Sequence, residues 1–211
     1  MTLITDFKPT KIIALGLNYI DHAKELNMKI PAEPVIFLKP PSALIKNGDK
    51  IIYPKGVTQL DYEAELALVI GKKTKNVPEE KINEYILGYT GFNDVTARDL
   101  QKKDGQWTRA KSFDTFCPVG PGIVPADGFD PSDIKIEARL NGKIKQSSST
   151  KNMIFKVPYI VSFLSGIMTL SPGDIIATGT PVGVGPMNVG DTIEISIDGI
   201  GTLKNYVVAE K

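Results

Sequence analysis

The amino-acid sequence predicts a mostly β protein of the α+β class with a few short helices. Short runs of branched and aromatic residues that end at glycine or proline recur along the chain and are typical of strands. Asn141-Gly142 and Asp198-Gly199 each separate two such runs, and these dipeptides favour tight hairpin turns. The chain has 211 residues, of which 42% are hydrophobic, so it can bury a sizeable core. We expect one domain spanning 1–211.

The N-terminal part of the chain predicts two strands with a short helix between them. The strands are expected at 11–16 and 35–39, and the helix at 19–27. His22 and Glu25 lie three residues apart on this helix and therefore share one face. A loop with two prolines follows, so the helix is short and can act as a mobile flap.

The middle and C-terminal parts predict several strands and three further helices, one of them a short helix after Asp94. Residues 78–85 fit a helix that begins at a proline and has acidic residues in its first turn, and a strand follows. Residues 102–108 are polar and are expected to form an exposed loop over which Trp107 packs. An amphipathic helix interrupted by Pro158 is expected at 153–164.

An acidic stretch at 60–71 carries charge in an unusual place. Its apolar run, 66–70, stops at a glycine and is typical of a strand entering a core. Alternate residues of a strand share a face, so Asp61, Glu63 and Glu65 are expected to point together. Crowded carboxylates repel one another and resist desolvation, and a hard divalent cation would relieve both costs. An exposed acidic edge with lysine partners fits the pattern equally well.

Three other single residues bear on function. Cys117 is the only cysteine, which fits a reducing cytoplasm, and its apolar surroundings indicate packing rather than a nucleophile. His22 is the only histidine, which excludes a multi-histidine metal site and leaves one imidazole for proton transfer near neutral pH. Asp94 stands at a predicted strand-to-helix junction, where a short acidic side chain commonly caps the helix.

Composition and charge argue against several classes of protein. The formal net charge is +1 and no long basic run occurs, so nothing favours nucleic-acid binding. The N-terminal residues lack the layout of a signal peptide, and no apolar run approaches transmembrane length. We therefore expect a cytoplasmic protein with neither a membrane nor a nucleic acid as partner. The glycine-rich segment 179–185 lacks the lysine of a phosphate loop, although it can bring the Thr180 hydroxyl close to an anionic ligand.

A series of motifs, in order along nearly the whole chain, resembles the fumarylacetoacetate hydrolase family. They are GLNYIDHAKE at 16–25, PVIFLKP at 34–40, DYEAEL at 61–66, NDVTARD at 93–99, KSFDTF at 111–116, NG at 141–142, TGTP at 178–181 and GVG at 183–185. Any one of them can arise by chance, whereas the ordered set is specific. The resemblance implies a mixed β-sheet roll, in the compact form without the extra N-terminal domain of the large eukaryotic hydrolase.

The resemblance also implies a metal site. The family's ligands correspond to Glu63, Glu65 and Asp94, which would hold Mg²⁺, or alternatively Mn²⁺ or Ca²⁺. Lys111, the lysine of the KSFDTF motif, is expected beside the metal. Asp61 is expected to be solvated or to lie behind the ligands, because many relatives vary there.

The remaining site residues are implied in the same way. His22 and Glu25 match a catalytic dyad that closes over the bound ligand, and Arg98, Gln101 and Thr180 match residues that hold the carboxylate and oxo groups of the substrate. Two features depart from close relatives. An arginine of some acylpyruvase-type relatives is replaced by Leu17, and the segment 185–190 is short.

The activity implied is that of a Mg²⁺-dependent hydrolase or lyase. It would cleave a C–C bond of a short 2-oxo or 2,4-dioxo acid through a metal-stabilised enolate, by acylpyruvate or fumarylpyruvate hydrolysis or by oxaloacetate decarboxylation. An isomerase or decarboxylase of 2-hydroxyhepta-2,4-diene-1,7-dioate in aromatic catabolism is the alternative enzyme. A non-catalytic metal- or carboxylate-binding protein on the same fold is the alternative of another class. Family members are typically homodimers, so we expect a homodimer.

Overall fold

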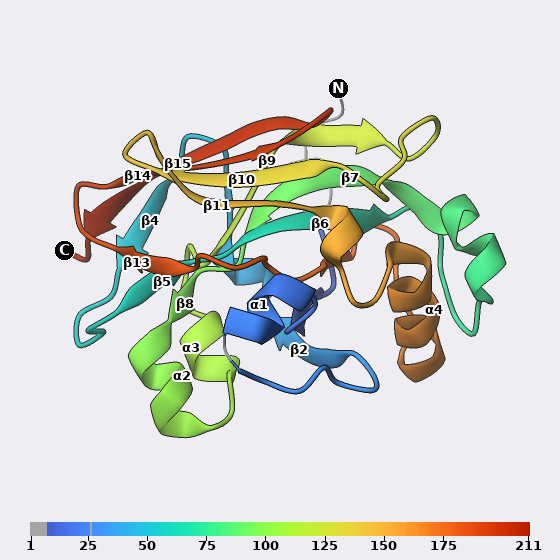
Figure 1. Cartoon of the computed structure of the whole chain (residues 1–211), viewed down its shortest axis with the longest axis horizontal. Helices are drawn as coiled ribbons and strands as arrows, with labels where there is room; N and C mark the ends of the chain where they lie inside the picture. The colour runs from blue at the N-terminus through green and yellow to red at the C-terminus, as the bar shows by residue number, and fades with distance from the viewer. Residues whose placement is uncertain (1–7, 26) are drawn as a thin grey trace.

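The computed structural model describes residues 8–25 and 27–211, and its strands form three sheets (Figure 1). The largest sheet contains, in spatial order, β2 (Val35–Lys39), β1 (Ile12–Gly16), β12 (Ile175–Ala177), β6 (Ala64–Ile70), β7 (Ile86–Asn93), β9 (Cys117–Pro125) and β3 (Leu44–Lys46). The second contains β11 (Lys143–Ser149), β10 (Lys135–Leu140), β14 (Thr192–Ile197), β15 (Gly201–Ala209) and β4 (Lys50–Tyr53). The third contains β13 (Gly185–Met187), β5 (Leu60–Tyr62) and β8 (Thr96–Ala97).

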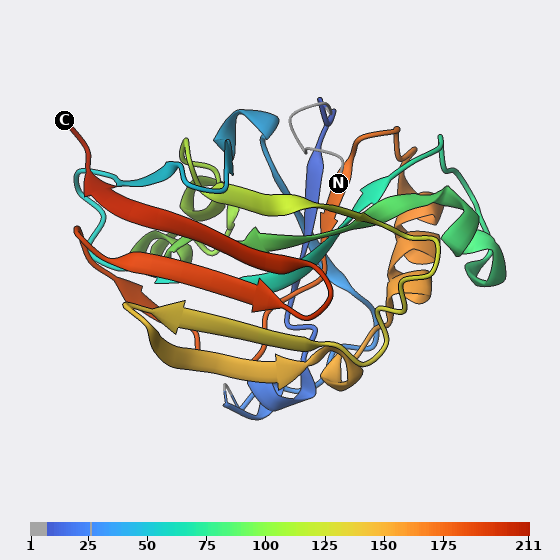
Figure 2. The same ribbon diagram turned by 90° about the horizontal axis from the view of Figure 1, so that it is seen from above.

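The sheets are mixed, as the predicted roll requires. β1 pairs in parallel with β12, β3 with β9, and β4 with β15, whereas the other pairings are antiparallel. Figure 2 shows four strands of the second sheet, β10, β11, β14 and β15, in yellow-orange to red, curving alongside the largest sheet. Strands β10, β14 and β15 pack against β6, β7 and β9, so the main hydrophobic core lies between these two sheets.

Strand β6 is buried on both faces. Leu66 and Leu68 belong to the main core, while Ala67 and Val69 belong to a second apolar cluster on the opposite face of the sheet. The continuous apolar run in the sequence therefore reflects burial on two sides rather than one.

The helices fall into two groups. Figure 1 shows α1 (Ile20–Glu25), α2 (Arg98–Asp104) and α3 (Thr108–Lys111) on the side of the molecule where β5 and β8 lie. At another end, α4 (Val157–Ile167) packs against the 3₁₀ helix η3 (Glu79–Tyr85). Two further 3₁₀ turns are η2 (Pro41–Ala43) and η4 (Thr150–Asn152). None of the described helices is long and apolar enough to cross a membrane.

The two predicted hairpins are confirmed. β10 and β11 flank Asn141-Gly142, and β14 is followed by the Asp198-Gly199 turn and β15. Asn141 and Gly142 have φ angles of 51° and 76°, the left-handed backbone that a tight primed turn requires at both central positions. A side chain other than glycine or asparagine is disfavoured there.

Two helix predictions and one loop prediction were wrong in detail. Pro158 lies in the first turn of α4, where its missing N–H costs nothing, so it starts the helix instead of interrupting it. Residues 79–85 form a 3₁₀ helix. Residues 102–108 are not an open loop, because α2 continues to Asp104 and α3 begins at Thr108.

The acidic stretch is not one continuous strand, because the chain leaves the sheet at Glu63. The Glu63 backbone N–H donates to Asn93 Oδ1 at 2.9 Å, and the Ala64 N–H donates to Gln146 Oε1 at 3.0 Å. At this point side-chain oxygens, instead of the backbone carbonyls of a neighbouring strand, accept the backbone N–H groups. Consequently Asp61 on β5 and Glu65 on β6 belong to different sheets, and the carboxylates lie at the junction.

Candidate metal centre and active site

Three buried carboxylates, Glu63, Glu65 and Asp94, come together at this junction. Each offers an oxygen, and these atoms all lie within 4.8 Å of one another. Ala64 is paired with Asn93 across β6 and β7, so the residues next to them meet at the end of the strand pair. The Asp94 N–H donates to the Glu63 carbonyl at 3.0 Å and closes this corner. We call these three residues the acidic triad.

Asp94 does not cap a helix. Helix α2 begins at Arg98, and its N-cap position is Ala97, which makes no side-chain cap. The Asp94 carboxylate instead accepts hydrogen bonds from Lys39 and, at 2.7 Å, from Lys111. The capping interpretation is therefore wrong, and the side chain points into the acidic triad.

Lysines neutralise two members of the triad. Lys111, only 2% exposed, donates to Glu63 Oε2 at 2.9 Å as well as to Asp94. Burial alone would lower the pKa of Lys111, but the charges of Asp94 and Glu63 raise it above its ordinary value. Burial raises the pKa of Glu63, and Lys111 with Arg98 outweighs this and lowers it to about 2.

Lys39 is a buried partner that sequence reasoning missed. Its ammonium group donates to Asp94, to the Phe116 carbonyl at 2.8 Å and to the Val95 carbonyl at 3.2 Å. The signal was present in the sequence: Lys39 ends an apolar strand directly before two prolines. A lysine in that place is buried only when it has partners.

Glu65 differs from the other two members of the triad, because none of the described lysine or arginine side chains lies at ion-pair distance from it. Its Oε2 accepts the Gly179 N–H at 2.8 Å, while Oε1 is buried and, among the described residues, unpaired. Burial, and then the charges of Asp94 and Glu63, raise the pKa of Glu65 well above its ordinary value. An all-carboxylate donor set with an unpaired oxygen fits a hard divalent cation such as Mg²⁺, Mn²⁺ or Ca²⁺.

Arg98 and Gln101 are paired within the protein. Arg98 donates to Asp61 at 2.8 Å, to Glu63 at 2.5 Å and to Gln101 Oε1 at 2.6 Å. Asp61 is 2% exposed and also accepts from Gln59 at 3.0 Å, so it is neither solvated nor part of the triad. Its carboxylate holds the Arg98 guanidinium in place.

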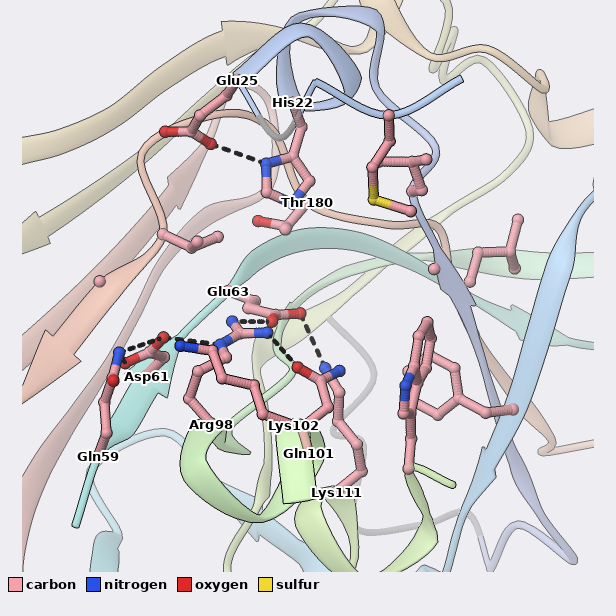
Figure 3. Close-up of a pocket in the computed structure, with 18 of the residues that line it drawn as sticks. His22, Glu25, Gln59, Asp61, Glu63, Arg98, Gln101, Lys102, Lys111 and Thr180 are labelled. Atoms are coloured by element: carbon pink, nitrogen blue, oxygen red, sulfur yellow. Dashed lines mark hydrogen bonds and ion pairs between the residues drawn. The ribbon is translucent and has the colours of Figure 1, made fainter. Parts of the chain in front are cut away.

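A pocket of about 660 Å³ opens above this network. Figure 3 shows Glu63, Arg98, Gln101 and Lys111 on one side of it and the dyad of α1 on the other. Every predicted catalytic and substrate residue lines this pocket, namely His22, Glu25, Lys111, Arg98, Gln101 and Thr180. Of the predicted ligands, Glu63 also lines it, while Glu65 and Asp94 lie in the triad behind.

The contact between His22 and Glu25 determines the tautomer of the imidazole. His22 Nδ1 lies 2.9 Å from Glu25 Oε2, and because an ionised carboxylate only accepts, Nδ1 carries the proton. The other ring nitrogen, Nε2, is then the basic one, and Figure 3 shows the ring beside Thr180. The Thr180 hydroxyl accepts from Gln146 Nε2 at 2.8 Å, which orients its own proton away from Gln146.

Helix α1 is anchored by a residue that sequence reasoning did not single out. Asp21 accepts the His22 backbone N–H at 2.8 Å through one oxygen and the Ser148 hydroxyl at 2.8 Å through the other. Ser148 in turn accepts from Asn152 at 3.1 Å. This chain of hydrogen bonds ties the dyad to β11, and an acidic residue in the first turn of a helix was its only signal in the sequence.

The remaining wall of the pocket is apolar. Trp107 packs edge-on against Phe37 with ring centroids 5.2 Å apart, and both line the pocket, so Trp107 does more than cover a loop. A Cβ at Gly16 would lie 2.6 Å from the Trp107 ring, which explains the glycine there. Leu17, beside it, has a φ angle of 53°, a strained conformation for leucine of the kind found at binding sites.

Comparison with known proteins gives one family. The profile of the fumarylacetoacetate (FAA) hydrolase C-terminal family matches residues 11–208. An uncharacterized protein of Methanocaldococcus jannaschii is 64% identical over 208 residues, 99% of this chain and 87% of the relative. The mitochondrial oxaloacetate tautomerase of Xenopus laevis is 45% identical over 210 residues, 95% of this chain and 66% of the relative.

Solved structures agree with this result. The crystal structure of 2-hydroxyhepta-2,4-diene-1,7-dioate isomerase from Mycobacterium marinum is similar with a TM-score of 0.90 and 48% sequence identity. The match covers 97% of this chain and 76% of that protein. The mixed β-sheet fold predicted from the sequence is therefore confirmed.

Proposed function

Because this chain belongs to the fumarylacetoacetate hydrolase family, we propose that it is a metal-dependent enzyme that interconverts the keto and enol forms of a short 2-oxo acid. Oxaloacetate represents the substrate class. One observation carries the proposal: the acidic triad and Lys111 lie at one side of a pocket whose other side holds the only imidazole of the chain.

The triad and Lys111 supply the electrostatic part of this chemistry. A divalent cation held by Glu63, Glu65 and Asp94 would act as a Lewis acid on the carboxylate and 2-oxo oxygens of such an acid. The ammonium group of Lys111 donates one N–H to Glu63 and one to Asp94, so its third N–H can donate to the substrate. Its positive charge, fixed in a buried site, stabilises negative charge that develops on the 2-oxo oxygen.

The dyad supplies the proton transfer. With Nδ1–H held by Glu25, His22 Nε2 takes the proton from the carbon next to the 2-oxo group and returns it to the oxygen. One proton leaves carbon and one reaches oxygen, so no other reactant is required. Glu25 keeps the ring in the tautomer in which Nε2 is free.

Two of the named relatives support proton transfer. A tautomerase at 45% identity and a solved isomerase at 48% identity are both named for reactions that move a proton. Cleavage of a C–C bond in a 2,4-dioxo acid, or decarboxylation, is the second candidate. Of these two cleavage reactions, hydrolysis fits the site better than decarboxylation, because an imidazole held by a carboxylate can also activate water.

A substrate panel with Mg²⁺ and with EDTA tests the proposal. We expect the ultraviolet absorbance of enol oxaloacetate to decay faster with enzyme and Mg²⁺, without release of pyruvate or CO₂. Acetylpyruvate, fumarylpyruvate and a 2-hydroxy-diene-dioate test cleavage and isomerisation in parallel. Release of pyruvate from the dioxo acids would move the assignment to the hydrolase. No turnover of any substrate by the Mg²⁺-bound protein would refute both the tautomerase and the hydrolase.

A further inference from the structure

The basic side chains of the pocket differ in what they already bind. His22, Arg98 and Lys111 each lie within 4 Å of the carboxylates described above. Lys102 also lines the pocket, but within residues 8–25 and 27–211 no carboxylate lies at salt-bridge distance from it. Of the cations that line the pocket, Lys102 is thus the one whose charge stays available to an anionic group of a ligand.

The position of Lys102 on α2 directs it to the substrate. Arg98, Gln101 and Lys102 are spaced i, i+3 and i+4, so they share one face of the helix, and all three line the pocket (Figure 3). Four residues of α-helix rise about 6 Å. Lys102 therefore lies about one helical turn beyond Arg98, whose guanidinium contacts Glu63 of the acidic triad.

The other walls are unsuitable for a second carboxylate. The α1 side presents Glu25, whose charge repels an anion. The wall of Leu17, Phe37 and Trp107 is apolar and would desolvate a carboxylate without a compensating partner. Among the described residues that line the pocket, the α2 wall is the one that offers a positive charge without a carboxylate partner.

We propose that Lys102 binds the distal carboxylate of a short 2-oxo diacid and so makes the enzyme prefer diacids to monoacids. This inference rests on the proposed function for the binding of the 2-oxo end at the acidic triad. It assigns Lys102 a role in specificity, since the reacting atoms lie at the other end of the substrate.

Enol decay of a diacid and a monoacid tests the preference. The probes are oxaloacetate and acetylpyruvate, and the measured quantity is the ratio of their kcat/KM values. Lys102→Met, which keeps the apolar stem, should lower this ratio about tenfold, mainly through the KM of oxaloacetate. Lys102→Arg should keep most of the preference, and Lys102→Glu should lower it further.

Lys103→Met is the matched control. Lys103 is the next residue of α2 and is exposed like Lys102, but it does not line the pocket, so its substitution should leave the ratio as in the wild type. An equal ratio in Lys102→Met, Lys103→Met and wild-type protein would overturn the proposal.

A binding measurement separates this inference from the proposed function. Malate and 2-hydroxybutyrate differ by one terminal carboxylate, and their dissociation constants with the Mg²⁺-loaded protein can be measured by calorimetry. Lys102→Met should raise the dissociation constant of malate and leave that of 2-hydroxybutyrate unchanged. Selective weakening without any tautomerase activity would refute the proposed function and support the role of Lys102. Tautomerase activity with equal effects of Lys102→Met on the binding of both ligands would support the proposed function and refute the role of Lys102. Failure of the wild-type protein to prefer malate over 2-hydroxybutyrate would also refute the role of Lys102, while the enol-decay assay alone decides the proposed function.

Discussion

The two sides of the pocket are built in opposite ways. The charged floor, defined as Glu63, Glu65, Asp94, Lys39 and Lys111, is almost completely buried. It comes from strands and loops around the largest sheet and from the end of α3. The roof is the dyad on α1, a helix of six residues in which the Glu25 side chain is 36% exposed. The floor is held by its own ion pairs, whereas the roof is held to β11 by the Asp21–Ser148 contact.

This difference indicates how binding and proton transfer are divided. Buried charges that have partners keep one geometry, because any movement would leave a charge unpaired in a medium of low polarity. A short helix with few anchors can shift at lower cost. We therefore expect changes in the floor to affect metal binding, stability and activity together, and changes in the roof to affect activity alone.

Substitution of Glu65 should have the largest effect on activity. Glu65→Gln removes the carboxylate that no cation neutralises, so Mg²⁺ binding should be lost and turnover should fall by about three orders of magnitude or more. The metal-free variant should be at least as thermostable as the wild type, because a neutral amide replaces a buried acid that resists ionisation. Calorimetric Mg²⁺ titration and thermal unfolding in EDTA measure both; a fully active variant would contradict the metal assignment.

Lys111→Met should damage stability as well as activity. The substitution leaves Glu63 and Asp94 without a shared cation, and breaking such a buried pair costs about 3 kcal/mol. Turnover should fall about 100-fold to 1000-fold, because Lys111 also stabilises charge on the substrate. Urea unfolding and initial rates test this, with Lys103→Met as the control; unchanged stability would show that the floor is less tightly coupled than its geometry indicates.

Substitution of His22 should separate the roof from the floor. In His22→Gln the basic nitrogen is lost, and turnover should fall about 100-fold. Metal affinity and melting temperature should stay as in the wild type, because His22 contacts none of the triad residues. A matching loss of Mg²⁺ affinity would contradict the proposal that the floor binds the metal and the roof transfers the proton.

Asp21→Ala should have a smaller effect of the same kind. It frees α1 from β11 and should lower kcat about tenfold, with little change in Mg²⁺ affinity or melting temperature. Ser148→Ala removes only the far hydrogen bond and should have a weaker effect. Normal kcat in both variants would show that the dyad is positioned by other contacts.

The pH dependence of the metal-free protein should show the smallest effect. A pKa raised on folding gives stability that is lost as pH rises, so Glu65 should make the melting temperature fall as pH rises above the ordinary pKa of a glutamate. The pKa of Glu63, lowered to about 2, acts in the opposite direction but only as pH falls from about 4.5 toward 2. Thermal unfolding in EDTA should show the slope in the wild type and its absence in Glu65→Gln; a rising melting temperature would contradict this.

Local patterns predicted most of the secondary structure. The hairpins at 141–142 and 198–199 and the strands β1, β2 and β7 follow from turn residues and apolar spacing alone. The break at Glu63 was not predicted, because it depends on Asn93 and Gln146, which lie 30 and 82 residues away in the sequence. Helix α2 was missed in part because its polar residues carry no apolar spacing.

The sequence by itself determined the class of the fold, the family and the residue types of the site, because these depend on local propensity and on motifs that can be read in order. It did not determine which charges pair with which. The tertiary structure decided that Lys39 and Lys111 neutralise Asp94 and that Arg98 is held by Asp61. Among the described residues, Glu65 and Lys102 have no ion-pair partner. Pairing depends on distance and burial, and both arise only when distant segments of the chain meet.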